Sequence, residues 1–216
     1  MRSDHGVRWA GIGCALLAAV LTALVVAGWG PVLSCDDRVA RDLHGHAVAH
    51  PGVTHTLRIL TDWVWDPWTM RLLATIACVR LWWLGQQERA VRVALATLGA
   101  AVVQQGLKAL VGRPRPVWPD PVDSALFSAY PSGHAMTATV VCGLLLWLLP
   151  RDAPRWAVRS AWAAAAVSVL GVGFTRIYLG VHWVSDVVAG WLLGVVVVAL
   201  ATSWPAPRHR SGPAGR

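Results

Sequence analysis

Residues 184–204 read VSDVVAGWLLGVVVVALATSW, an apolar run that contains one charged residue, Asp186. A helix needs about 20 residues to cross the roughly 30 Å hydrocarbon core of a bilayer, and this run has that length. The rest of the chain shares its character, because 56% of all residues are hydrophobic and only 14% are charged. The sequence therefore predicts an integral membrane protein.

Further apolar segments of similar length precede this run. The six predicted spans cover residues 7–29, 68–84, 90–111, 133–149, 156–177 and 184–204. They lack the alternating pattern of a β-barrel wall, and a helix satisfies its backbone polar groups within lipid. We expect one all-α domain over residues 1–216, a six-helix transmembrane bundle with a helical or interfacial outer segment between the first two spans. We expect the first span to be a retained anchor and residues 205–216 to be a disordered cytoplasmic tail.

The distribution of arginine predicts the orientation in the membrane. Both termini and two of the short connections carry the excess of arginine that is typical of the cytoplasmic side. These residues are Arg2, Arg8, Arg89, Arg92, Arg151, Arg155, Arg159, Arg208, Arg210 and Arg216. We expect a multi-pass protein of the inner (plasma) membrane with both termini in the cytoplasm. Three arginines on the outer side run against the rule and indicate another role: Arg113, Arg115 and Arg176. Nucleic acid is not an expected partner, although the formal net charge is +8.

Three polar clusters lie at span ends on this outer side. They are Lys108, the only lysine of the chain, with Arg115; Pro131-Ser132-Gly133-His134; and Arg176 with His182 and Asp186. Unrelated polar residues in a membrane protein would be scattered between both sides. Their placement predicts one site at the outer face of the membrane.

The residue types in these clusters suit phosphate chemistry. A helix that starts at Gly133, with Ser132 as its natural N-cap, offers unpaired N–H groups and the positive end of the helix dipole. Three cations, Lys108, Arg115 and Arg176, would stabilise the oxygens of a phosphoryl group in transfer.

Two histidines would supply the reaction itself. His182 and Asp186 are four residues apart, so on a helix they share a face, and the carboxylate can keep one ring nitrogen protonated. The other nitrogen is then a nucleophile. His134, from a different helix, would be the general acid for the leaving oxygen and later the base for water.

Each of these residues also has a purely structural interpretation. Lys108 can extend from a helix end to the headgroups, Arg113 and Arg115 can form a basic turn, and His182 can pair with Asp186 only to anchor a helix. Because the purely structural interpretation needs all these coincidences on one face of the membrane, we favour a functional site there.

The three clusters resemble the signature of the type 2 phosphatidic acid phosphatase (PAP2) superfamily. That signature is a lysine, six residues and Arg-Pro; then Pro-Ser-Gly-His; then Ser-Arg, five residues, His, three residues and Asp. The resemblance implies a six-helix membrane fold that needs no metal ion or other cofactor. It implies that His182 becomes a phosphohistidine, oriented by Asp186, and that His134 is the leaving-group acid. The implied phosphate cradle is Lys108, Arg115, Ser132, Gly133 and Arg176; Thr175 stands where the family usually has serine.

A phosphate site at headgroup level suits a lipid phosphate whose tail stays in the bilayer. Members of the resembling family act on undecaprenyl diphosphate, phosphatidylglycerol phosphate, phosphatidic acid or diacylglycerol pyrophosphate, and these residues do not rank the tails. Transfer to an acceptor alcohol, non-catalytic binding of lipid phosphate and anion transport stay open as alternatives, as does the oligomeric state.

The outer segment between the first two spans contains two further groups. His44, His46, His50 and His55 fit no zinc spacing, so we expect a solvated polar loop there and no metal. Trp63, Trp65 and Trp68 are expected to form an interfacial belt.

Overall fold

The computed structural model describes residues 2–203, and these residues contain α-helices, one π-helical turn and no strand. The elements are α1 (Arg2–Val26), α2 (Gly30–Ala49), α3 (Pro51–Ile59), η1 (Leu60–Val64), α4 (Pro67–Trp83), α5 (Gln87–Val111), α6 (Gly133–Trp147), α7 (Arg155–Tyr178) and α8 (Val184–Ser203). The all-α prediction is confirmed, and the segment between the first two predicted spans is helical. The predicted tail, residues 205–216, lies outside the described part.

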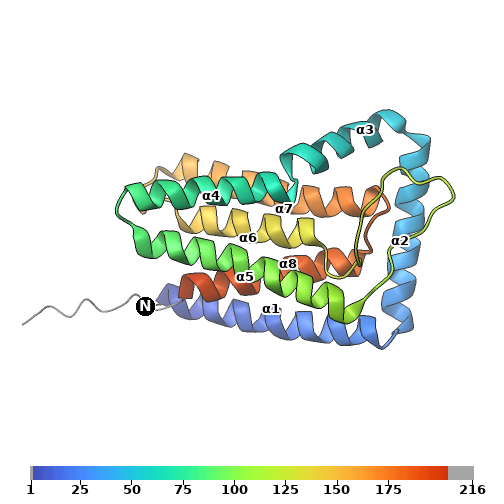
Figure 1. Ribbon diagram of the computed structural model, residues 1–216, viewed down its shortest axis with the longest axis horizontal. Helices are drawn as coiled ribbons and strands as arrows, with labels where there is room; N and C mark the ends of the chain where they lie inside the picture. The colour runs from blue at the N-terminus through green and yellow to red at the C-terminus, as the bar shows by residue number, and fades with distance from the viewer. Residues whose placement is uncertain (1, 204–216) are drawn as a thin grey trace, which may run out of the picture.

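Helices α1, α4, α5, α6, α7 and α8 run along the long axis, and α2 crosses one end of them (Figure 1). Within the described residues, α1 (from His5), α5, α7 and α8 are long and apolar enough to cross a membrane. The other two are shorter, with 17 residues in α4 and 15 in α6. Helices form at all six predicted positions, but only four reach the length of a full span.

The short helix α6 has a consequence for the depth of the site. At 1.5 Å per residue, α6 is about 22 Å long, less than the hydrocarbon core. Figure 1 shows that it starts deeper in the bundle than the ends of α1 and α5, below the irregular segment 112–132. The start of α6 therefore lies below that segment, and Ser132 and Gly133 are buried there.

Small residues make the helix contacts in the apolar part of the bundle. A methyl group added at Gly11 of α1 would stand 2.7 Å from Ala199 of α8, and one at Gly194 of α8 would stand 2.6 Å from Thr139 of α6. Large apolar side chains point outward instead; Leu16, Leu95, Leu98, Val102 and Leu170 are all more than half exposed. This inverted distribution is typical of helices that contact lipid.

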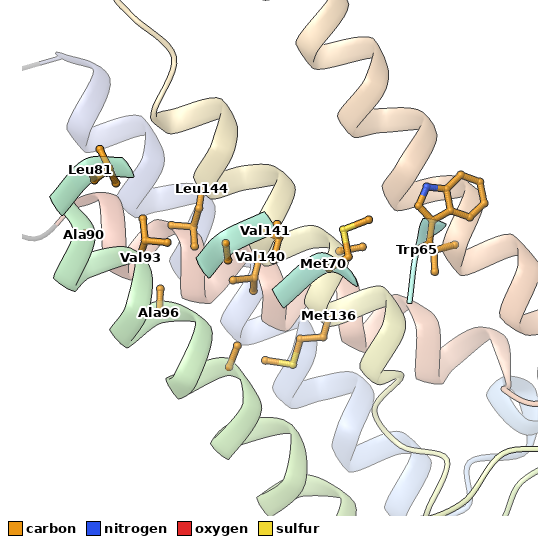
Figure 2. Packing of buried hydrophobic residues seen from close by; sticks show 14 residues of the cluster. Trp65, Met70, Leu81, Ala90, Val93, Ala96, Met136, Val140, Val141 and Leu144 are labelled. Atoms are coloured by element: carbon orange, nitrogen blue, oxygen red, sulfur yellow. The ribbon is translucent and has the colours of Figure 1, made fainter. Parts of the chain in front are cut away.

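A compact apolar core lies between α4, α5 and α6 (Figure 2). Met136, Val140, Val141 and Leu144 of α6 form its centre and are at most 1% exposed. Because these residues cover two adjacent sides of α6, the helix is surrounded by its neighbours and is held firmly at the middle of the bundle.

The expected solvated histidine loop is wrong in part. The segment is helical, and His44 is only 5% exposed because it lies on the inner face of α2. Its ring stacks on Trp118 of segment 112–132, with ring centroids 4.1 Å apart. His46, His50 and His55 are exposed, and no group of three metal-binding side chains occurs in the described residues.

The expected tryptophan belt is also wrong at one position. Trp63 and Trp68 are 74% and 75% exposed, but Trp65 is 9% exposed and belongs to the core. The chain turns back after η1 to begin α4, which directs the Trp65 ring into the bundle against Gly171 of α7 (Figure 2).

Candidate active site

The end of α5, the start of α6, the end of α7 and the start of α8 lie at the same end of the bundle, beside α2 (Figure 1). Gly112, with a φ of 59°, ends α5 in the left-handed conformation that glycine adopts without strain. Pro114 and Pro116 follow and prevent the helix from continuing. Segment 112–132 then connects α5 to α6 at this end of the bundle. Because the three polar clusters lie at these helix ends, they all come to this end.

His182 contacts a carboxylate on one side and a guanidinium on the other. Its Nδ1 lies 3.3 Å from Asp186 Oδ2, and its Nε2 lies 3.1 Å from an Arg115 nitrogen. A carboxylate only accepts and a guanidinium only donates, so the two partners require the same tautomer: Nδ1 carries the proton and Nε2 carries the lone pair. His182 lies two residues before α8, so the pair forms at the helix entrance and not along its face.

The surroundings of His182 keep its ring neutral. Burial, and then the positive charges of Arg115, Arg176 and Lys108, lower the pKa of His182 well below its ordinary value. Only the neutral ring has a lone pair for attack. The charges of Arg176, Arg115 and Lys108 also act on His134, which is half-buried in the first turn of α6.

Arg115 is anchored to the backbone of its surroundings. Besides His182, it donates hydrogen bonds to the carbonyls of Val181 (2.5 Å), Phe127 (2.9 Å) and Leu126 (3.0 Å). Burial and the neighbouring Arg176 lower the pKa of Arg115 to about 10. The guanidinium therefore remains charged at neutral pH.

The other two cations are buried with few partners. Lys108 is 7% exposed and donates a hydrogen bond to the carbonyl of Ser128. Arg176 is 3% exposed, lies 3.5 Å from Asp123 and 3.4 Å from Thr61, and has an Nε with no hydrogen-bond partner. A buried donor without an acceptor is rare, so this end of the bundle has spare capacity to bind an anion.

The start of α6 adds further donors. Ser132 occupies the N-cap position as expected, but its side chain makes no capping bond and its buried hydroxyl has no partner. The Ser132 N–H donates to the carbonyl of Asp186 (2.9 Å), which ties the start of α6 to α8. A methyl group at Gly133 would stand 2.5 Å from the flexible end of the Gln104 side chain, so the start of α6 lies close to α5. Thr175, by contrast, donates its hydroxyl to Val172 of its own helix (2.8 Å).

A second carboxylate, Asp36 of α2, reaches the site from the outer segment. Arg113 forms ion pairs with Asp36 (2.7 Å) and with Asp186 (2.6 Å). Ser185 donates to Asp36 through both its N–H (2.8 Å) and its hydroxyl (2.5 Å). Sequence reasoning identified Arg113 only as an arginine on the unexpected side and missed Asp36, Ser185 and Asp123. The burial of Asp36, Ala40, His44 and Ala47 follows helical spacing, and that spacing was the available signal.

Comparisons with known proteins find relatives of similar sequence. The chain is 35% identical over 96 residues to phosphatidylglycerophosphatase B of Bacillus subtilis, covering 44% of this chain and 47% of that protein. It is 40% identical over 76 residues to an undecaprenyl-diphosphatase of Sulfolobus acidocaldarius, covering 35% of this chain and 31% of that protein. The chain therefore spans less than half the length of these two relatives.

A solved structure shares the fold. The crystal structure of a transmembrane PAP2-type phosphatidylglycerolphosphate phosphatase from Bacillus subtilis matches with a TM-score of 0.79 and 22% identity, over 90% of this chain and 94% of that one. The sequence profile of the PAP2 superfamily matches residues 89–210, which include all three polar clusters and more than half of the chain. The chain belongs to the PAP2 superfamily.

Proposed function

We propose that the chain is a membrane phosphatase that hydrolyses the phosphomonoester or diphosphate of a lipid through a phosphohistidine at His182. The observation that carries this proposal is the pair of contacts on the His182 ring. Asp186 faces Nδ1 at 3.3 Å, and Arg115 faces Nε2 at 3.1 Å. The nucleophilic nitrogen is thus turned toward a cation that could hold a phosphate oxygen.

In the first step, Nε2 attacks phosphorus and the bond to the leaving oxygen breaks. His134, which carries a proton once the bound anionic phosphate offsets the neighbouring cations, gives that proton to the oxygen, and the product alcohol or lipid phosphate leaves. Arg115 turns from Nε2 to a phosphoryl oxygen, and Lys108 and Arg176 share the charge on the others. Asp186 stabilises the imidazolium that forms, as the carboxylate does in a serine-protease triad.

In the second step, water attacks the phosphohistidine. His134, now neutral, takes a proton from the water, and the bond between phosphorus and Nε2 breaks to release inorganic phosphate. The lone pair returns to His182. The unpartnered hydroxyl of Ser132 and the first N–H groups of α6 are the remaining donors for the phosphoryl oxygens.

The substrate we propose is a lipid because the site lies beside apolar helix surfaces. The names of the relatives refer to phosphatidylglycerophosphate, undecaprenyl diphosphate and, for a Rhizobium leguminosarum protein 33% identical over 158 residues, lipid A. A tail can remain along the exposed apolar faces while the phosphate binds at the start of α6. We place this site on the outer face of the inner membrane, with both termini in the cytoplasm.

Phosphate release from purified protein in detergent with EDTA tests this proposal. The substrates are phosphatidic acid, phosphatidylglycerol phosphate and a polyprenyl diphosphate, and release from at least one of them is expected. No release from any of them, or a strict requirement for added Mg²⁺, would overturn the proposed reaction. Added acceptor alcohols separate hydrolysis from phosphotransfer, because a transferase would yield a new phosphate ester.

A further inference from the structure

We propose that Asp36 of α2 is a positioning residue for the nucleophile: through Arg113 it holds Asp186 so that one carboxylate oxygen faces Nδ1 of His182. This inference rests on the proposed role of His182. Asp36 lies 150 residues before Asp186 and outside the three polar clusters, so its role follows from the packing of α2 over the site.

Every contact of the Asp36 carboxylate is directed at the site. The residue is 2% exposed, and its oxygens accept hydrogen bonds from Arg113 and from the backbone N–H and hydroxyl of Ser185. Ser185 directly precedes Asp186. A carboxylate buried this deeply is stable only when it is paired and fully hydrogen-bonded.

Arg113 is shared between two carboxylates. One terminal nitrogen donates to Asp36 (2.7 Å), and the other donates to Asp186 Oδ1 (2.6 Å) and to Ser185 (2.7 Å). Guanidinium and carboxylate pair best through two parallel hydrogen bonds. Asp36 prevents that arrangement at Asp186, because it occupies one of the two terminal nitrogens of Arg113.

The consequence for Asp186 is that its second oxygen stays available. Oδ2 accepts from the N–H of Trp183 (2.9 Å) and faces His182 Nδ1 at 3.3 Å, the longest contact in the chain of interactions. Without the charge of Asp36, Arg113 would take both oxygens of Asp186 and weaken this contact. The His182 ring would then lose the partner that keeps the proton on Nδ1.

A simpler role for Asp36 would be to fasten α2 to the bundle through Ser185. The two roles differ in their dependence on Arg113. If Asp36 acts through Arg113, removal of Asp36 lowers kcat no further once Arg113 has been replaced. If Asp36 only fastens α2, its removal lowers kcat by the same factor with or without Arg113.

The kinetic test compares Asp36→Asn with Asp37→Asn, both in wild type and in Arg113→Gln. Asp37 is a matched control because it lies next to Asp36 but pairs with Arg41 on the exposed side of α2. We expect Asp36→Asn to lower kcat by about 10- to 100-fold with KM changed less than about twofold, since the cations of the phosphate cradle are untouched. Its effect should fall below about twofold in Arg113→Gln. An equal loss in both backgrounds, or a loss confined to KM, would refute the inference.

A second measurement does not need activity. In ¹⁵N-histidine-labelled protein, the His182 signals are assigned by their loss in His182→Gln, and their shifts report the tautomer. We expect the Nδ1–H form in wild type and a mixture with the Nε2–H form in Asp36→Asn. If Asp36→Asn does not fold, Asp36→Ser removes the same charge with a smaller polar side chain and should give the same mixture. An unchanged tautomer in the folded variants contradicts the positioning role, whereas a wild type that hydrolyses no lipid phosphate contradicts only the proposed function.

Discussion

The two parts of this helix bundle are held together by different interactions. At the site end, Asp36, Asp186 and Arg176 are buried; the half-buried Arg113 joins Asp36 to Asp186 by ion pairs, and Arg176 pairs with Asp123. In the middle, α8 meets α1 and α6 through glycine, alanine and threonine, and α4, α5 and α6 pack around a core of larger apolar side chains. The same helices α6, α7 and α8 pass through both parts.

This difference predicts how each part responds to substitution. A buried ion pair contributes little net stability, but removal of one partner leaves an uncompensated charge at a cost of about 3–5 kcal/mol. In the middle, close contact is the main attraction between helices, so added volume costs about 1–3 kcal/mol. Substitutions that break a pair at the site end should therefore change both chemistry and stability, and those in the middle should change stability alone.

The largest effect is expected at His182. His182→Ala removes the proposed nucleophile, so phosphate release should fall by at least about 10³-fold while the protein remains helical in detergent. The assay is phosphate release, with circular dichroism for folding. His50→Ala, on the exposed side of α2, is the control and should change turnover less than about twofold. Substantial turnover by His182→Ala would exclude its nucleophilic role.

The next effect concerns Asp186. Asp186→Asn keeps the shape of the side chain but removes the charge that orients His182 and pairs with Arg113, so kcat should fall by about 10²- to 10³-fold. Asp152→Asn, in an exposed turn outside the site, provides the control. Both are measured as kcat and KM on the best substrate of the panel. If Asp186→Asn retained full kcat, the ion-paired end would not differ in function from the apolar middle.

The pH dependence of kcat/KM should show the buried character of His182. Because burial and neighbouring cations lower its pKa, the ring stays neutral below the ordinary imidazole value of 6.5, and activity is lost only as pH falls through the lowered pKa. In a profile measured between about pH 4 and 9, the midpoint of the acidic limb of kcat/KM should therefore lie below 6.5. At mildly acidic pH the activity should be up to about tenfold higher than an unperturbed ring would allow. A limb at or above 6.5 would indicate that the ring is not shielded as described.

The smallest effect on activity is expected in the apolar middle. Gly194→Ala brings a methyl group to 2.6 Å from Thr139 and should destabilise the protein by about 1–3 kcal/mol with turnover changed less than about twofold. Gly99→Ala, where nothing lies within 4 Å, should be neutral or slightly stabilising. Thermal unfolding in detergent measures both. Equal unfolding temperatures would mean that close contact at α6 and α8 does not matter.

Most of the helices could be predicted from hydropathy, because the length of an apolar run is a local property. The errors occurred in the outer segment, where His44 and Trp65 are buried although their sequence neighbourhood is polar. Which face of a short amphipathic helix is covered depends on what packs against it. For His44 that partner is Trp118, which lies 74 residues further along the chain.

Sequence alone was sufficient for the membrane class, the helical fold, the residues of the three clusters and their resemblance to the PAP2 superfamily. These conclusions rest on composition, periodicity and motif spacing, all of which are written in neighbouring residues. The tautomer of His182, the unpartnered hydroxyl of Ser132 and the connection from Asp36 through Arg113 to Asp186 needed three-dimensional packing. They depend on contacts between residues about 70 to 150 positions apart, and spacing along a chain carries no information on such distances.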